Sequence, residues 1–278
     1  MEINGDVITW LMSGDPAIRW QVMQDILHAD SLSVETERLN IATDGWGARL
    51  LSYQDPDGLW AGQLYDHKWI STTYTMLLLR QLGLSVDNSH ARLACKKLLN
   101  GGYQPEGALS YSKSKKVFDL GVNGMVLSIL AYFHFSDDRL HRVAEFLLSQ
   151  QCDDGHWAPC LDNMSLKYCF DTTLQVLEGF AEYIHHYPDR RLFFDHALSL
   201  GIEFLLKHNI YINDQGKPIE KKWTLFSFPP RWHYDVLAAM DFIFRYGYPY
   251  DHRMDKAIQL IQSKQRTDGR WVSQNRHA

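Results

Sequence analysis

One sequence pattern, Gln-x-x-Asp-Gly-x-Trp, occurs three times and constrains the fold more than any other feature of the chain. Its copies are Gln54–Trp60, Gln151–Trp157 and Gln265–Trp271. They begin about 100 residues apart, which is twice the length of an ordinary structural repeat. Two degenerate copies, Gly102–Gly107 and Asn213–Gly216, lie midway between them. Because self-similarity at a fixed period is the signature of repeat architectures, the chain is predicted to contain five repeats.

The hydrophobic periodicity indicates what each repeat contains. The loops follow amphipathic stretches such as Arg142–Leu148, in which apolar residues recur at helical spacing. The Asp-Gly pair supplies the left-handed residue that commonly ends a helix. A second and more apolar helix precedes each amphipathic one, and a helix that is apolar nearly all round belongs inside the protein. The expected inner helices span residues 17–28, 69–84, 118–135, 168–186 and 231–247.

These patterns predict an all-α fold, an α/α toroid of about five pairs of inner and outer helices. An open solenoid is the alternative for stacked helix pairs, but the buried inner helices and the small number of repeats favour closure. A chain of 278 residues fits one large domain, so residues 1–278 are expected to form a single toroid. The repeats are expected at approximately 15–62, 63–110, 111–160, 161–220 and 221–275.

Charge and composition narrow the choice of partners. The formal net charge is −5, whereas a nucleic-acid-binding surface normally needs a basic excess, so no nucleic-acid partner is expected. No stretch is long and apolar enough to predict a transmembrane helix, and peripheral contact with a membrane is left open. The start, Met1–Asp6, lacks the pattern of an export signal, and the four cysteines form no C-x-x-C pair. Reduced thiols in the cytoplasm are therefore expected, while the oligomeric state stays undetermined.

The Gln-x-x-Asp-Gly-x-Trp pattern resembles the QW motif of squalene and hopene cyclases, and related repeats occur in the β-subunits of protein prenyltransferases. With the degenerate copies, the resemblance covers nearly the whole chain. It implies the α/α toroid, in which the Gln and Trp side chains tie neighbouring outer helices together. Such motifs are structural, so the function has to be argued from the site.

The chain departs from both families at the positions that carry their chemistry. The D-x-D-D motif of class II terpene cyclases is absent, and the chain is about half as long as the two-domain cyclases. Prenyltransferases bind zinc through Asp, Cys and His, and Cys169 and His233 lie in comparable helices. The D-x-C spacing of that family is missing, however, because Lys167 stands two residues before Cys169. No metal and no cofactor is therefore assigned, with zinc at Cys169 and His233 left open.

Four expected inner helices begin with a bulky apolar residue followed by a short polar one. In a toroid these starts share one mouth of the barrel, so their carboxylates would face a common cavity. Asp and Ser are also favoured N-cap residues, and capping alone could explain them. The four pairs are Ile70-Ser71, Phe118-Asp119, Phe170-Asp171 and Tyr234-Asp235.

The segment Arg231–Asp235 is the strongest site candidate, because it packs a cation, an indole, an imidazole, a phenol and a carboxylate into about one turn. The candidate catalytic residues are Asp171, Asp235, His233 and Asp119. The candidate substrate-binding residues are Trp69, Phe118, Tyr168, Phe170, Arg231, Trp232 and Tyr234.

The resemblance favours a protein that handles an isoprenoid-like substrate in a central apolar cavity, by proton-initiated cyclisation or isomerisation. One of the carboxyl groups would act as the acid and His233 as the orienting group or base, and aromatic faces would stabilise carbocations. Two alternatives stay open. Paired carboxylates on an α/α barrel also suit a glycan hydrolase or lyase, and the toroid could be a binding scaffold without catalysis.

Overall fold

The computed structural model describes residues 5–112, 118–158 and 165–275. All regular secondary structure in these ranges is helical, and strand-like pairing is limited to isolated bridges. The predicted all-α fold class is confirmed, and the succession of helices is consistent with an α/α toroid. No helix within the described ranges combines the length and the apolarity that crossing a membrane requires.

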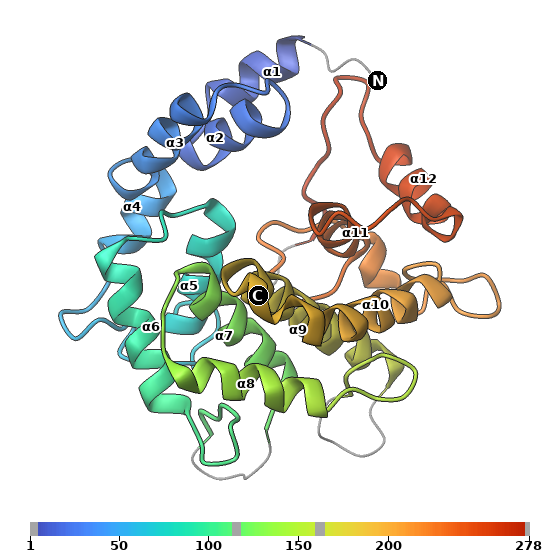
Figure 1. Cartoon of the computed structure of the whole chain (residues 1–278). Coiled ribbons are helices and arrows are strands. Elements are labelled where there is room, and N and C mark those ends of the chain that lie inside the picture. The colour runs from blue at the N-terminus through green and yellow to red at the C-terminus, as the bar shows by residue number, and fades with distance from the viewer. Residues whose placement is uncertain (1–4, 113–117, 159–164, 276–278) are drawn as a thin grey trace. The chain divides into compact units, whose positions relative to one another are not determined.

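The helices are labelled in Figure 1. The α-helices are α1 (Gly5–Met12), α2 (Pro16–Asp25), α3 (Ser31–Leu39), α4 (Gly45–Leu51), α5 (Thr72–Leu82), α6 (Ser89–Gly102), α7 (Leu120–Tyr132), α8 (Asp138–Ser149), α9 (Leu166–His186), α10 (Arg191–Lys207), α11 (Val236–Arg245) and α12 (Asp255–Ser263). Short 3₁₀ turns are η1 (Asn40–Ala42), η2 (Pro188–Arg190), η3 (Lys221–Thr224) and η4 (His252–Met254).

The chain packs as two compact units. The first runs to Gly101 and also contains Tyr132–Phe135 and Arg266–Arg270, so it holds α1 to α5 and nearly all of α6. The second contains the described residues within 102–131, 136–265 and 271–275, and therefore most of α7 together with α8 to α12.

In the first unit the core forms around α5, almost all of which is buried. Its C-terminal end is covered by long side chains from α2 and α3. The Trp20 indole donates a hydrogen bond to the Leu82 carbonyl at 2.9 Å, and the Arg38 guanidinium donates to the Gly83 carbonyl at 2.7 Å. These bonds satisfy carbonyl groups that a helix end leaves without partners.

In the second unit α7 is buried from Leu120 to Ala131, as expected for an inner helix. It packs against α9 at unusually close range because glycines meet there. A Cβ atom on Gly124 would lie 2.6 Å from the carbonyl oxygen of Gln175, and one on Gly179 would lie 2.7 Å from that of Gly124. Only residues without a side chain allow this approach.

All five sequence loops, including the two degenerate ones, form the same turn. In each, the first residue donates its N–H to the carbonyl four residues later, and a glycine in between donates back to the first residue. All five glycines have positive φ, which explains the residue type. The turns span Asp55–Leu59, Gln104–Ala108, Cys152–His156, Asn213–Lys217 and Arg266–Arg270.

The Gln and Trp side chains of the pattern have separate tasks. Each indole donates to a carbonyl near the end of the helix before it, as Trp157 does to Leu147 at 2.7 Å. The side-chain amide of the Gln instead contacts the outer helix that follows the turn. Gln151 donates both to Gly155 within its own turn, at 2.8 Å, and to Ala197 of α10, at 2.9 Å. The Trp thus caps the preceding outer helix, and the Gln joins the turn to the next one.

Candidate functional site

Asp171 is the central acidic group of the second unit. Helix α9 begins at Leu166, so Asp171 lies in its second turn and is not the N-cap of that helix. One carboxylate oxygen, Oδ1, instead accepts a hydrogen bond of 2.6 Å from the backbone N–H of Tyr234. The carboxyl group therefore links α9 to the turn that leads into α11.

Burial raises the pKa of Asp171 from 3.8 to about 7. The Tyr234 N–H and the positive charge of Lys167 act in the opposite direction, while the negative charge of Glu220 adds to the rise. Lys167 and Glu220 pair with each other at 3.5 Å, so their opposing effects on Asp171 partly cancel. Desolvation thus dominates, and Asp171 can hold or release a proton near neutral pH.

A cluster of aromatic rings lies next to Asp171. Phe170 is fully buried, and its ring centroid lies 4.8 Å from that of Trp223 and 5.2 Å from that of Tyr234. Trp223 and Tyr234 also contact each other, at 4.7 Å. The rings meet at tilted or edge-on angles, which their quadrupoles favour. Phe170 is the chain neighbour of Asp171, and Tyr234 donates its backbone N–H to the Asp171 carboxylate, so two members of the cluster belong to residues next to this group.

The turn at Arg231–Asp235 is held in place from two sides. The side-chain amide of Gln175, on α9, donates to the carbonyl of Trp232 at 3.3 Å. The Tyr234 hydroxyl donates to the carbonyl of Ile210 at 2.7 Å. His233 stacks on Trp232 with ring centroids 3.9 Å apart. The structure therefore brings Asp171, Phe170 and most of the Arg231–Asp235 segment together.

Asp235 and Asp119 are N-caps. Oδ1 of Asp235 accepts the N–H of Ala238 at 2.8 Å, and its Oδ2 accepts the hydroxyl of Ser227 at 3.1 Å. Burial raises the pKa of Asp235 despite these bonds. Asp119 is exposed and caps α7 by accepting the N–H of Val122 at 3.1 Å. Both carboxylates thus satisfy helix-end donors.

The structure also corrects the alignment of the inner helices that the sequence suggested. Three residues on α5, α7 and α9 make an equivalent bond, in which a side-chain oxygen accepts the N–H at the end of the preceding turn. The pairs are Thr72 with Trp60, Asn123 with Leu109, and Thr173 with Trp157. Counted from these equivalent residues, Asp171 lies two positions before Thr173, whereas Asp119 lies four positions before Asn123. The two acids are therefore not in equivalent positions.

The remaining candidate aromatic residues lie in different surroundings. Tyr168, on α9, lies beneath the ammonium of Lys167, which is 5.0 Å from its ring centroid. Phe118 packs edge-on against Phe146 of α8, with centroids 5.5 Å apart. Trp69 belongs to the first unit, where its ring lies 5.0 Å from that of Tyr74.

Cys169 has the residue type of a zinc ligand. Its side chain is buried in α9, and burial raises the pKa of the thiol. Within the described ranges, the structure contains no group of three or more His, Cys, Asp or Glu side chains arranged to hold a metal ion.

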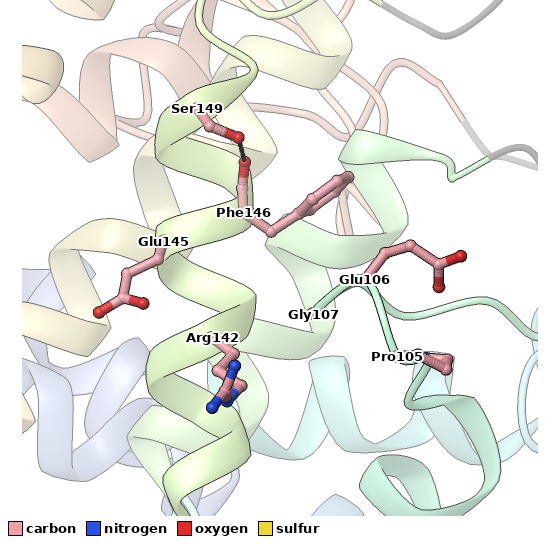
Figure 2. Close-up of a pocket in the computed structure, with 7 residues that line it drawn as sticks. All are labelled: Pro105, Glu106, Gly107, Arg142, Glu145, Phe146 and Ser149. Atoms are coloured by element: carbon pink, nitrogen blue, oxygen red, sulfur yellow. Dashed lines mark hydrogen bonds between the residues drawn. The ribbon is translucent and has the colours of Figure 1, made fainter.

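A surface cavity of about 270 Å³ lies between α8 and the turn at Pro105–Gly107 (Figure 2). Figure 2 shows the Phe146 ring pointing toward the side of Glu106, whereas the Glu145 carboxylate points away from it. The cavity contains none of the candidate site residues, and charged and polar side chains dominate its lining. It is not the apolar cavity that an isoprenoid would need. The lining residues are Pro105, Glu106, Gly107, Arg142, Glu145, Phe146 and Ser149.

Sequence reasoning missed two residues that shape this site, Gln175 and Trp223. Gln175 follows Asp171 by four residues on α9, so both side chains lie on the same face of the helix. Helical spacing from Asp171 could have identified Gln175. Trp223 comes from the 3₁₀ turn η3, where no periodic pattern marks its position.

Comparisons with known proteins are informative about the fold. No protein-family model matches the chain, and no curated protein sequence matches it. The chain is similar to the crystal structure of a protein from Actinoplanes, with 14% identity, a TM-score of 0.51, and coverage of 92% of this chain and 72% of the other. At this identity the likeness speaks for the fold alone.

Similarity also extends to the type II terpene cyclase MstE from Scytonema. Its apo structure is 14% identical with a TM-score of 0.39, over 87% of this chain and 82% of the cyclase. A substituted form of that cyclase, in complex with its substrate geranylgeranyl dihydroxybenzoate, gives the same identity and TM-score over 85% of this chain and 80% of the cyclase.

Proposed function

We propose that this chain is a QW-repeat protein of the terpene-cyclase type and that it acts on an isoprenoid-like substrate. Its reaction would be a proton-initiated cyclisation or isomerisation, with Asp171 as the acid. The observation that carries the proposal is a partly buried carboxyl group whose pKa, raised to about 7, lets it carry a proton near neutral pH, and which lies on the chain beside a member of an aromatic cluster. A general acid needs a pKa close to the working pH, and Asp171 meets this condition.

The chemistry follows from these groups. The O–H bond of the neutral Asp171 breaks, and its proton forms a C–H bond with the π electrons of an alkene, leaving a carbocation on the substrate and a carboxylate on the protein. Aromatic faces stabilise the cation. Loss of a proton from the cation to His233 or water then gives the isomerised or cyclised product, and Asp171 regains a proton from solvent.

The absence of D-x-D-D is compatible with this role. In the class II motif, neighbouring carboxylates help to keep the acid protonated. Here the desolvation of a single carboxyl group is the largest contribution to the raised pKa of Asp171. The charge of Glu220 supports it from outside the helix.

The proposal is tested by incubating the protein with farnesyl diphosphate, geranylgeranyl diphosphate and squalene, followed by product analysis by mass spectrometry. We expect a cyclised or isomerised product from at least one of these substrates, and its loss in Asp171→Asn. Asp30→Asn is the matched control, because Asp30 is an exposed N-cap of α3 and Asn caps equally well. Retention of an isoprenoid without turnover would favour a binding scaffold, and neither binding nor turnover would overturn the proposal.

A further inference from the structure

The two carboxylate oxygens of Asp171 are not equivalent. Oδ1 accepts the Tyr234 N–H at 2.6 Å, and the described part of the chain offers no other hydrogen bond to this carboxyl group. In a protonated carboxyl group one oxygen becomes an O–H donor, while the other keeps its full capacity to accept. The short bond to Tyr234 therefore selects Oδ1 as the oxygen without the proton.

The position of the Tyr234 N–H depends on a second contact from the same helix face. Gln175 is buried, with 5% of its surface exposed, and its amide donates to the Trp232 carbonyl at 3.3 Å. Asp171 and Gln175 are four residues apart, so both reach the same turn from α9. The Tyr234 hydroxyl fixes the far side of the turn on Ile210. Three bonds thus hold residues 232–234 against the carboxyl group.

We infer that Gln175 is a positioning residue. By holding the Trp232 carbonyl it fixes the Tyr234 N–H on Oδ1 of Asp171, so that Oδ2 is the oxygen that carries the proton and delivers it. The catalytic meaning of this arrangement rests on the proposed function, whereas the arrangement itself is a property of the protein without substrate.

Other charged groups around Asp171 are not part of the hydrogen bonds that join Gln175, Trp232, Tyr234 and Asp171. Lys167 lies one helical turn before it and pairs with Glu220, while Asp235 is the N-cap of α11 and is bonded to Ser227. None of these bonds involves Gln175. Removing the Gln175 amide therefore changes the hydrogen bond to Asp171 without removing a charge from its surroundings.

The test is an NMR titration of the Asp171 carboxyl carbon in the wild-type protein and in Gln175→Met, without substrate. Met has a similar length but no N–H, so the turn loses one of its attachments and the Tyr234 N–H moves away from Oδ1. Because that N–H favours the charged form, its loss should move the titration midpoint of Asp171 upward by about 1 pH unit. Gln259→Met, on the exposed face of α12, is the matched control and should leave the midpoint unchanged.

A second variant keeps the inference testable if Gln175→Met does not fold. Tyr234→Phe removes the bond to the Ile210 carbonyl and should also raise the midpoint. A folded variant whose midpoint stays at the wild-type value, or falls, overturns the inference. The titration does not depend on turnover. If the wild-type protein is inactive but Gln175→Met shifts the midpoint, the proposed function is wrong and the positioning role of Gln175 is still supported.

Discussion

The indole N–H of Trp157 donates a hydrogen bond of 2.7 Å to the carbonyl of Leu147, ten residues earlier in the chain. Trp60 and Trp271 make the same bond over the same separation, to Leu50 and Ile261. The Trp of the repeated pattern is thus a C-terminal cap, since it satisfies one of the last carbonyls of a helix and closes the turn that follows.

Replacing Trp157 with Phe should lower the free energy of unfolding by about 1 to 3 kcal/mol, because a buried carbonyl is left without its donor. The smaller ring adds a further loss of packing. Trp271→Phe removes the same bond at a site where 42% of the side chain is exposed, and water can replace the donor. We expect Trp271→Phe to cost less than about 1 kcal/mol. Urea unfolding of both variants measures the difference, and equal losses would contradict the capping role.

The turn glycines should differ in their tolerance of a side chain. Gly155 has φ of 96°, and a Cβ atom there would overlap the carbonyl oxygen of Leu200. Gly216 has φ of 73° but open space around it. Gly155→Ala should cost about 2 to 5 kcal/mol from strain and overlap together, whereas Gly216→Ala should cost about 1 to 2 kcal/mol from strain alone. Thermal unfolding of the two variants tests this order.

Asp171 should make the stability of the protein depend on pH. Its pKa of about 7 in the folded state lies above the ordinary value of 3.8, so between these values the folded state holds more protons than the unfolded state. The contribution of Asp171 to the free energy of unfolding therefore falls as the pH rises from about 4 to about 7. In Asp171→Asn this slope should flatten, and the variant should be more stable than the wild type at pH 8 by up to about 4 kcal/mol.

Urea unfolding of the wild type and Asp171→Asn at pH 5 and pH 8 measures this dependence. Asp30→Asn serves again as the control, because Asp30 is exposed and its substitution should leave the slope between these pH values as in the wild type. A variant with the wild-type slope would show that Asp171 is ionised in the folded protein throughout this range.

Turnover should decline above neutral pH if Asp171 is the proton donor. The acid form is the active one, so kcat should be highest below pH 7 and fall about tenfold for each pH unit above it. The measurement is product formation across pH 5 to 9 with the substrate that gives turnover. A rate that rises through pH 7 would assign the acid role to another group.

Much of the fold could be predicted because its signals are local. The period of the Asp-Gly turns and the apolar character of Met125–Leu130 are properties of short segments, and they predicted the helices and the all-α class. The register between helices is not local, and there the prediction failed. Asp119 and Asp171 both follow a Phe, yet one caps α7 and the other lies inside α9, because α7 begins directly after Asp119 whereas α9 begins at Leu166, five residues before Asp171.

The sequence by itself determined the repeated turns. The glycine with positive φ and the bond from the Trp indole to a carbonyl ten residues earlier both involve residues that are close together in the chain. It also marked Asp171 and the Arg231–Asp235 segment as chemically rich. Only the tertiary structure decided which of the candidate carboxyl groups have raised pKa values. Tyr234 lies 63 residues from Asp171 in the chain, and burial depends on everything packed around the carboxyl group. Desolvation and long-range hydrogen bonds depend on which residues are neighbours in space, and the spacing of residues along the chain does not predict those neighbours.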